Sequence, residues 1–185
     1  LSYGATFATI YLDNYVTDPD NTPAQMTWGY SGNIQLTVAI SAARVATITK
    51  PSADWHGSES IIFTATDPGL LFDSDTATFS IAAPTPILKI TPDTLKFNAY
   101  AGGSNPAGQG TMITNTGTGT LDWNASETAA WLYISSTSGT APSGLTDSVD
   151  IAGLAPGSYF ADVTVTAAGA SNSPQVLKVI LHIKT

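Results

Sequence analysis

Few side chains in this sequence have the types and spacing that catalysis requires. Asp54 and Glu59 could act as paired carboxyl groups in general acid/base chemistry, but nothing in the sequence supplies a cleft around them. The two histidines are isolated from each other, with His56 in a turn and His182 on the outward face of the last predicted strand. Without a set of acid, base and nucleophile, we predict that the chain is not an enzyme.

Three further patterns are similar to functional loops but do not complete them. The Gly-x-Ser-Gly run at residues 29–32 is followed by Asn33, so it fails the nucleophile-elbow pattern. The glycine-rich run at residues 103–110 lacks the Lys-Ser/Thr of a phosphate-binding loop. Asp73-Ser74-Asp75 has metal-like spacing, but it stands just before a predicted strand, and a solvated turn is the preferred interpretation.

The elements that must position these residues are strands. In the closing stretch, residues 153–183, apolar and polar side chains alternate on either side of a small-residue turn at 167–174. The inward set consists of Tyr159, Ala161, Val163, Val165, Leu177, Val179, Leu181 and Ile183. Period-two alternation buries one face of each strand and leaves the other in water, so this stretch predicts a hairpin of an all-β protein.

Composition excludes several classes of protein. The net charge of −8, with six Lys and Arg, argues against nucleic-acid binding, which needs many cations. The sequence has no apolar run of the length that crosses a membrane, about 18 residues, and no Cys for disulfides or thiolate chemistry. An acidic chain rich in Thr, Ser and Gly that lacks Cys fits a bacterial exported protein, although a cytosolic chain can also lack Cys.

The best domain boundary is the segment Ala82–Pro86, whose two prolines cannot donate ladder hydrogen bonds. We predict a first domain at 1–83 and a second at 84–185, in two tandem immunoglobulin-like β-sandwiches joined by a short Pro-containing linker. The first half has eight acidic and two basic residues, and the second half has six and four. The acidic excess therefore lies in the first domain.

The strands expected in the first domain are Phe7–Leu12, Gln25–Tyr30, Ile34–Ile40, Ala43–Thr49, Ser60–Thr66 and Thr76–Ile81. Those expected in the second are Leu88–Ile90, Leu95–Ala99, Gly110–Asn115, Leu121–Asn124, Leu132–Ser135, Ser148–Ile151, Tyr159–Thr166 and Val176–Ile183. One helical turn is expected at Ser126–Ala130.

Residues 6–82 resemble bacterial cadherin-like, dystroglycan-type domains. The motifs are the Asp-x-Asp of Asp18 and Asp20, the TATDPG turn with Asp67, and the Asp-Trp-x-Gly-x-Glu turn within Pro51–Phe63. The resemblance implies that Asp18, Asp20 and Asp67 are candidate ligands of Ca²⁺ at one end of the sandwich. The linker departs from the family by carrying no acid. The competing interpretation, that these are turn residues, is preferred, so we expect no cofactor and weak Ca²⁺ binding at most.

Nearly all of residues 87–185 resembles the BACON-type immunoglobulin-like domains of bacterial secreted proteins. The segments that carry the resemblance are Ile90–Gly103, Ile113–Ser126, Trp131–Gly144 and the closing tract. This family implies carbohydrate binding, which needs exposed aromatic rings, and the candidates are Trp55, Tyr100, Trp123, Trp131 and Tyr133. Only Trp55, beside His56 and Gly57, is expected to be exposed, and Trp123 and Trp131 are expected in or around the core.

These expectations combine into one functional prediction. The chain is a non-catalytic spacer or adhesion module of a larger bacterial secreted or cell-surface protein, and it lies outside the cell as a monomer. The alternative is a carbohydrate-binding accessory module beside a glycan-active enzyme, with Trp55 as its ligand-binding residue. The expected partners are neighbouring domains of the full-length chain and a glycan or a surface protein, without nucleic acid or membrane insertion.

Overall fold

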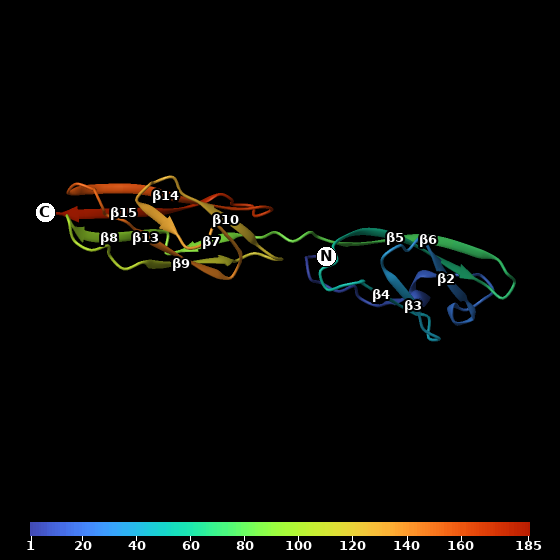
Figure 1. Ribbon diagram of the computed structural model, residues 1–185. Coiled ribbons are helices and arrows are strands. Elements are labelled where there is room, and N and C mark those ends of the chain that lie inside the picture. The colour runs from blue at the N-terminus through green and yellow to red at the C-terminus, as the bar shows by residue number, and fades with distance from the viewer. The chain divides into compact units, whose positions relative to one another are not determined.

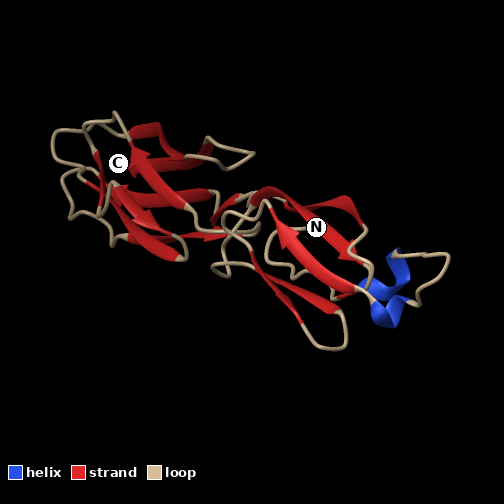
Figure 2. Cartoon of the chain, turned by 90° about the vertical axis from the view of Figure 1, so that its right-hand side faces the viewer, coloured by secondary structure: helices blue, strands red, loops and turns tan.

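The computed structural model describes residues 1–185, which divide into two compact units, Leu1–Ala83 and Pro84–Thr185 (Figure 1). The predicted all-β class is confirmed, because the regular elements are strands apart from two short 3-10 helices (Figure 2). No helix has the length and apolar character that a membrane crossing requires.

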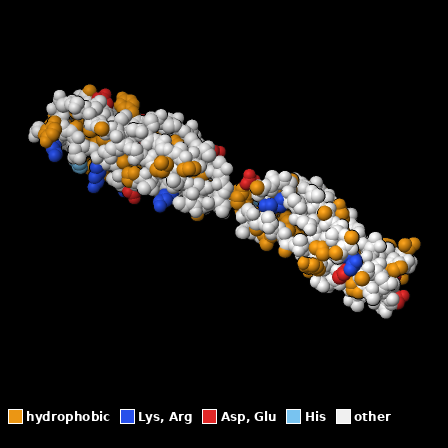
Figure 3. All heavy atoms as spheres, turned by 90° about the horizontal axis from the view of Figure 1, so that it is seen from below, with side chains coloured by type: hydrophobic (Ala, Val, Ile, Leu, Met, Phe, Trp, Pro, Cys, Tyr) orange, Lys and Arg blue, Asp and Glu red, His pale blue; other side chains and the backbone are white.

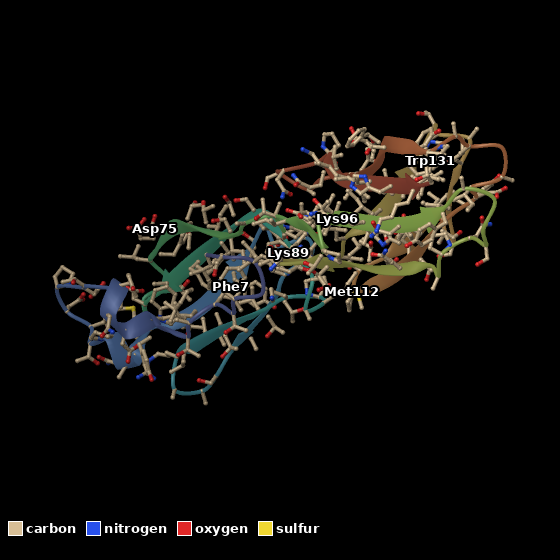
Figure 4. All side chains as sticks on the ribbon, turned by 90° about the vertical axis from the view of Figure 1, so that its left-hand side faces the viewer. Phe7, Asp75, Lys89, Lys96, Met112 and Trp131 are labelled. Carbon is tan, nitrogen blue, oxygen red and sulfur yellow. The ribbon has the colours of Figure 1, made fainter.

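The N-terminal unit contains two three-stranded sheets, in the strand orders β1-β4-β3 and β2-β5-β6. Its elements are β1 (Ile10–Tyr11), η1 (Leu12–Tyr15), η2 (Pro23–Gln25), β2 (Thr27–Ser31), β3 (Thr37–Ile40), β4 (Val45–Thr49), β5 (Gly57–Thr66) and β6 (Phe72–Ile81). Alternation along β5 and β6 turns Ile61, Phe63, Phe79 and Ile81 into the core between the sheets. Phe7, which is labelled in Figure 4, packs edge-on against Trp55 and Phe79 in the same core.

Two expectations for the N-terminal unit are wrong. The strand expected at Phe7–Leu12 is limited to Ile10–Tyr11, because the chain turns into η1 and buries Leu12. Asp73 and Asp75 lie within β6 and not in a turn before it. The tight turn closed by the Asp67 N–H, which donates to the Leu71 carbonyl, lets β6 pair with β5 from Phe72 onward.

The C-terminal unit packs a five-stranded sheet, β12-β10-β14-β15-β8, against a four-stranded sheet, β11-β13-β9-β7. Its strands are β7 (Leu88–Thr91), β8 (Thr94–Tyr100), β9 (Gln109–Asn115), β10 (Asp122–Ser126), β11 (Leu132–Ile134), β12 (Ser138–Thr140), β13 (Ser143–Val149), β14 (Gly157–Ala167) and β15 (Gln175–Lys184). β15 pairs antiparallel with β14 and parallel with β8, so it is an inner strand of the larger sheet beside the edge strand β8.

The closing hairpin has the predicted alternation. Val163, Val165, Leu177, Val179 and the following inward residues of β15 are buried in the main core of this unit. Three details differ from the expectation. The strand expected at Ser148–Ile151 is centred earlier, at Ser143–Val149, β12 was not predicted, and residues 126–130 form no helix because β10 continues to Ser126.

Candidate functional site

The first two predicted metal residues lie in a turn before η2. Asp18 is half-buried, and its Oδ1 accepts the backbone N–H groups of Asp20 at 3.1 Å and Asn21 at 2.8 Å. These backbone hydrogen bonds lower the pKa of Asp18, whereas the neighbouring Asp18 carboxyl raises the pKa of Asp20. Asp20 is exposed and belongs to no cluster of side chains that could coordinate a metal ion. Asp18 therefore acts as a turn residue.

The third predicted metal residue, Asp67, lies at the end of β5 and is 9% exposed. Its Oδ1 accepts the N–H of Leu71 at 2.8 Å and holds the β5–β6 turn closed. A Cβ atom on Gly69 would lie 3.2 Å from this oxygen, so the turn leaves little room for another side chain at that position. Asp67 thus stabilises the hairpin, and it uses one of its two carboxyl oxygens to do so.

The structure contains no group of three acidic, His or Cys side chains that could hold a metal ion. Asp18 and Asp67 line the same pocket, but Asp20 does not. Calcium requires six to eight oxygen ligands. The three predicted residues as arranged here do not fit such a site.

The pocket that Asp18 and Asp67 line has a floor built by the β2-β5-β6 sheet. Trp28, Ala65 and Asp73 form one row across the three strands, because Trp28 and Asp73 both pair with Ala65. In the adjacent row, Asp75 pairs with Phe63. Directly opposed side chains of antiparallel strands lie about 5 Å apart on the same face, so the small Ala65 leaves a hollow between Trp28 and Asp73.

The pocket walls come from the segment that replaces the expected first strand. Leu12 and Tyr15 of η1 and the following residues 16–18 face the end of the β5–β6 hairpin across a volume of about 390 Å³. Figure 2 shows the two helices in blue at one end of their unit. Because β1 has only two residues, the second sheet does not cover this end of the hairpin, and the interior remains open there.

Asp73 and Asp75 are pocket residues that the sequence interpretation had placed in a solvated turn. Asp75 stands on β6, the outer strand of its sheet (Figure 4). The carboxyl oxygens of Asp73 and Asp75 accept the N–H groups of Ser74 at 2.8 Å and Thr76 at 2.7 Å. The signal that could have found them is their alternation with Ala77, since all three share the inward face of one strand.

Trp55 was expected to be exposed, and this is wrong, because the side chain is only 9% exposed and belongs to the core of the N-terminal unit. Its Nε1 donates to Oε1 of Gln35 at 2.5 Å. The ring also lines a shallow hollow of about 230 Å³ with His56 and Glu59. Packing against Phe7 removes the open ring face that stacking on a sugar would need.

Glu59, the candidate acid/base partner of Asp54, has a structural role. It accepts the backbone N–H groups of Ile34 at 2.6 Å, Gln35 at 2.9 Å and Leu36 at 3.3 Å. Desolvation raises the pKa of Glu59, but these backbone hydrogen bonds together outweigh it and lower the pKa. A carboxylate held in its charged form by three amides is suited to fixing the preceding loop and not to proton transfer.

In the C-terminal unit the tryptophans belong to the core, as predicted. Trp123 is 2% exposed and donates its Nε1 to the Ser143 hydroxyl, whereas Trp131 is partly buried and packs edge-on against Tyr159. The exposed aromatic rings of this unit are Tyr100, Tyr133 and Phe160.

The core of the C-terminal unit also contains a buried carboxyl group that the sequence interpretation missed. Asp147 on β13 is fully buried, and its Oδ2 accepts the hydroxyl of Thr111 at 3.1 Å. Its Oδ1 has no hydrogen-bond partner. Burial raises the pKa of Asp147 to about 6, with the Thr111 hydrogen bond opposing the shift. The one side chain in hydrogen-bond contact with Asp147 is the hydroxyl of Thr111, with no second titratable group, so we assign it no catalytic role.

Comparison with known families finds a resemblance in the C-terminal unit. The family model of the viral BACON domain matches residues 87–178, which is most of that unit. The expected BACON-type resemblance is thereby confirmed, and the match points to a non-catalytic domain. No curated protein matches the chain.

Solved structures similar to the chain come from several kinds of protein. A Bacteroides ovatus GH5 xyloglucanase in complex with a XXXG heptasaccharide is 22% identical at a TM-score of 0.43, over 53% of this chain and 19% of that one. A protein of unknown function from Porphyromonas gingivalis W83 is 14% identical at a TM-score of 0.44, over 84% of each chain. Cadherin ectodomains are also among them, including Drosophila N-cadherin EC1-4, which is 14% identical at a TM-score of 0.43 over 87% of this chain and 41% of that one. The chain thus spans less than half the length of the xyloglucanase and of this cadherin.

Proposed function

We propose that the chain is a non-catalytic module that spaces and presents neighbouring domains of a larger exported or cell-surface protein, and that adhesion is part of this role. The observation that carries the proposal is that several carboxyl groups of the chain hold its own backbone in place. Asp18, Glu59 and Asp67 accept backbone N–H groups of turns and loops, which leaves them as structural residues. The BACON match over residues 87–178 supports the same class of function.

A spacer needs units that stay folded while force or proteolysis acts on the whole protein. Each unit here has its own apolar core, with Ile61 and Leu36 among the fully buried side chains of the first and Phe97 and Trp123 among those of the second. Apolar burial is the dominant favourable term in folding, so two separate cores support units that fold without help from each other.

The location that we propose is extracellular, on a bacterial surface or in a secreted protein. The absence of Cys means that folding in an oxidising environment needs no disulfide pairing. The chain would act as a monomer there, and its partners would be adjoining domains of the full-length protein and a surface protein.

Turnover assays test the non-catalytic part of this proposal. The full chain is incubated with a panel of soluble plant and bacterial polysaccharides and with generic ester and glycoside chromogenic substrates. The expected result is no product above a heat-denatured control. Turnover of any substrate that is lost on mutation of a carboxyl group of the chain would contradict the proposal.

A carbohydrate-binding accessory module is the second candidate, and the exposed ring of Phe160 is the observation that favours it. Phe160 lies on the outer face of the larger sheet with 71% of its surface exposed. Its neighbour across the strands is Ile180, and the next pairs on the same face are polar, with Ser158 opposite His182 and Asp162 opposite Lys178. An exposed ring beside polar groups is what a sugar-binding face requires. Glycan retention that is lost in Phe160→Ala and kept in Trp55→Phe would favour this candidate over a plain spacer.

A further inference from the structure

The pocket beside η1 combines negative charge with an apolar interior. We propose that it binds a Lys or Arg side chain that a partner protein presents on an apolar segment. The proposal rests on the proposed function, because it names the chemistry of the partner that an adhesion module would engage.

The charge of the lining is the first argument. Asp18, Asp67, Asp73 and Asp75 line the pocket, and no Lys, Arg or His does. The basic side chains of the unit are engaged elsewhere. Arg44 makes a bidentate ion pair with Asp13, at 2.6 and 2.8 Å, and the Nζ of Lys50 donates to a backbone carbonyl. The pocket therefore lacks an internal counter-charge and is complementary to a cation from outside.

Unpaired polar atoms are the second argument. Asp67 is nine-tenths buried, yet only its Oδ1 is hydrogen-bonded, which leaves Oδ2 to accept from a ligand. Trp28 also lines the pocket, and its Nε1 is buried with no hydrogen-bond partner. A buried donor without a partner costs free energy. A peptide that carries a basic side chain supplies both missing partners, since its ammonium or guanidinium group donates and its backbone carbonyl accepts.

The apolar part of the lining selects the stem of the ligand. Phe63, Ala65 and Ala77 lie on the inward face of the sheet among the carboxyl groups. The methylene chains of Lys and Arg cover apolar surface while the charged head stays with its polar partners. An inorganic cation would leave this surface uncovered, whereas an organic cation on an aliphatic stem fills it.

The mouth of the pocket favours a protein segment over a free amine. Tyr15, Leu71 and Phe72 line it and are each more than 70% exposed, and the equally exposed Leu70 precedes Leu71 in the β5–β6 turn. On the right-hand unit in Figure 3, orange apolar side chains are exposed over much of the visible face, with a few red and blue charged groups among them. Contiguous exposed apolar side chains on a soluble protein mark interaction surfaces. A small amine would bury the pocket interior but leave these four side chains in water.

The test uses the full chain and a fluorescent peptide, acetyl-Leu-Lys-Leu-Arg-Leu-amide, in an anisotropy titration. Binding is expected at about 50 mM salt and is expected to weaken at about 500 mM, because partly exposed charges are screened. The neutral control peptide contains acetyl-lysine and citrulline in place of Lys and Arg, and its binding is expected to be at least about tenfold weaker.

Two variants assign binding to the pocket. Asp75→Asn changes an exposed side chain and is expected to weaken binding about tenfold. Ala77→Phe keeps every charge but fills the interior of the pocket, and it is also expected to weaken binding. The matched control, Asp162→Asn, removes an exposed strand carboxyl from the other unit and is expected to bind as the wild type does. Melting curves of each variant identify any loss that comes from unfolding, and Asp75→Asn alone decides if Ala77→Phe does not fold.

Five outcomes would overturn the proposal: no binding of the charged peptide, equal binding of the neutral peptide, wild-type binding by folded Asp75→Asn, displacement by butylamine at the peptide's own concentration range, or displacement by micromolar Ca²⁺. The proposed function fails separately. A spacer without this binding site gives neither turnover nor peptide binding, whereas an enzyme gives turnover whatever the peptide does.

Discussion

The Nε1 of Trp55 donates a hydrogen bond to Oε1 of Gln35 at 2.5 Å, and the ring packs edge-on against Phe7 in the core of the N-terminal unit. The polar run around Trp55 therefore hides an inward-facing aromatic side chain. Trp55 therefore stabilises the sandwich and is not a candidate for stacking on a sugar.

Trp55→Ala should lower the free energy of unfolding of the N-terminal unit by about 3 to 5 kcal/mol, since it removes a large buried ring and leaves a cavity. Trp55→Phe keeps an aromatic ring and should cost less. Denaturant unfolding measures both. The matched control is Phe160→Ala, which removes an exposed ring and should change stability by no more than about 0.5 kcal/mol. A loss below about 1 kcal/mol in Trp55→Ala would contradict the core assignment.

Asp147 should make the stability of the C-terminal unit depend on pH. Its pKa is about 6 in the folded unit against 3.8 for an ordinary Asp, so the folded state holds the proton more tightly. The stabilisation from this group is then complete below about pH 4 and is lost as the pH rises through 6. At pH 7 the loss amounts to at most about 3 kcal/mol.

Asp147→Asn removes this titration, so the difference in unfolding free energy between variant and wild type should favour the variant more at pH 7 than at pH 4. Urea unfolding at several pH values between these limits measures the difference. Asp162→Asn, which removes an exposed carboxyl opposite Lys178, serves as the matched control for a change of Asp to Asn. A constant difference across the range in Asp147→Asn would mean that Asp147 is charged in the folded protein throughout.

Gly139 should be intolerant of a side chain. It pairs with Trp123 across β12 and β10, and a Cβ atom there would lie 2.7 Å from Cζ2 of the indole. Because Trp123 is held in the core, Gly139→Ala should destabilise the C-terminal unit by about 1 to 3 kcal/mol. Gly110→Ala, on β9, meets no heavy atom within 4 Å and should be neutral or slightly stabilising. Thermal melting of the two variants compares them, and equal melting temperatures would contradict the close approach.

Calcium should have little effect on the isolated chain. Asp18 and Asp67 already accept backbone N–H groups, and Asp20 does not line their pocket. We expect the melting temperature to be the same in millimolar Ca²⁺ and in chelator. A calorimetric dissociation constant below about 10 µM would show a complete oxygen cage and overturn this expectation.

The alternation of side chains was enough to predict the sheets but not every strand boundary. The closing hairpin was predictable because Val163, Leu177 and the other inward residues repeat with period two in a long, unbroken pattern. The start of β6 was not, because Asp is disfavoured in strands and Asp73 and Asp75 read as turn residues. Pairing with β5 outweighed that local preference.

The candidate site was predictable only in its acidic character. Asp18 and Asp67 were identified from their motifs and do line the pocket, but Trp28 and Tyr15 carry no sequence signal that separates a pocket wall from ordinary core. The pocket exists because the chain turns into η1 after only two residues of β1. The turn into η1 depends on the burial of Leu12 in the core of the whole unit, and no local sequence pattern predicts that burial.

Single-molecule force spectroscopy tests the central claim, that the chain is a spacer made of two self-sufficient units. The full chain, tethered through both ends, should unfold in two separate events. Their contour-length gains should approach about 300 Å for the unit Leu1–Ala83 and about 370 Å for the unit Pro84–Thr185, less the folded lengths. One cooperative event that releases the whole chain, or one unit extending without a measurable unfolding event, would contradict the account.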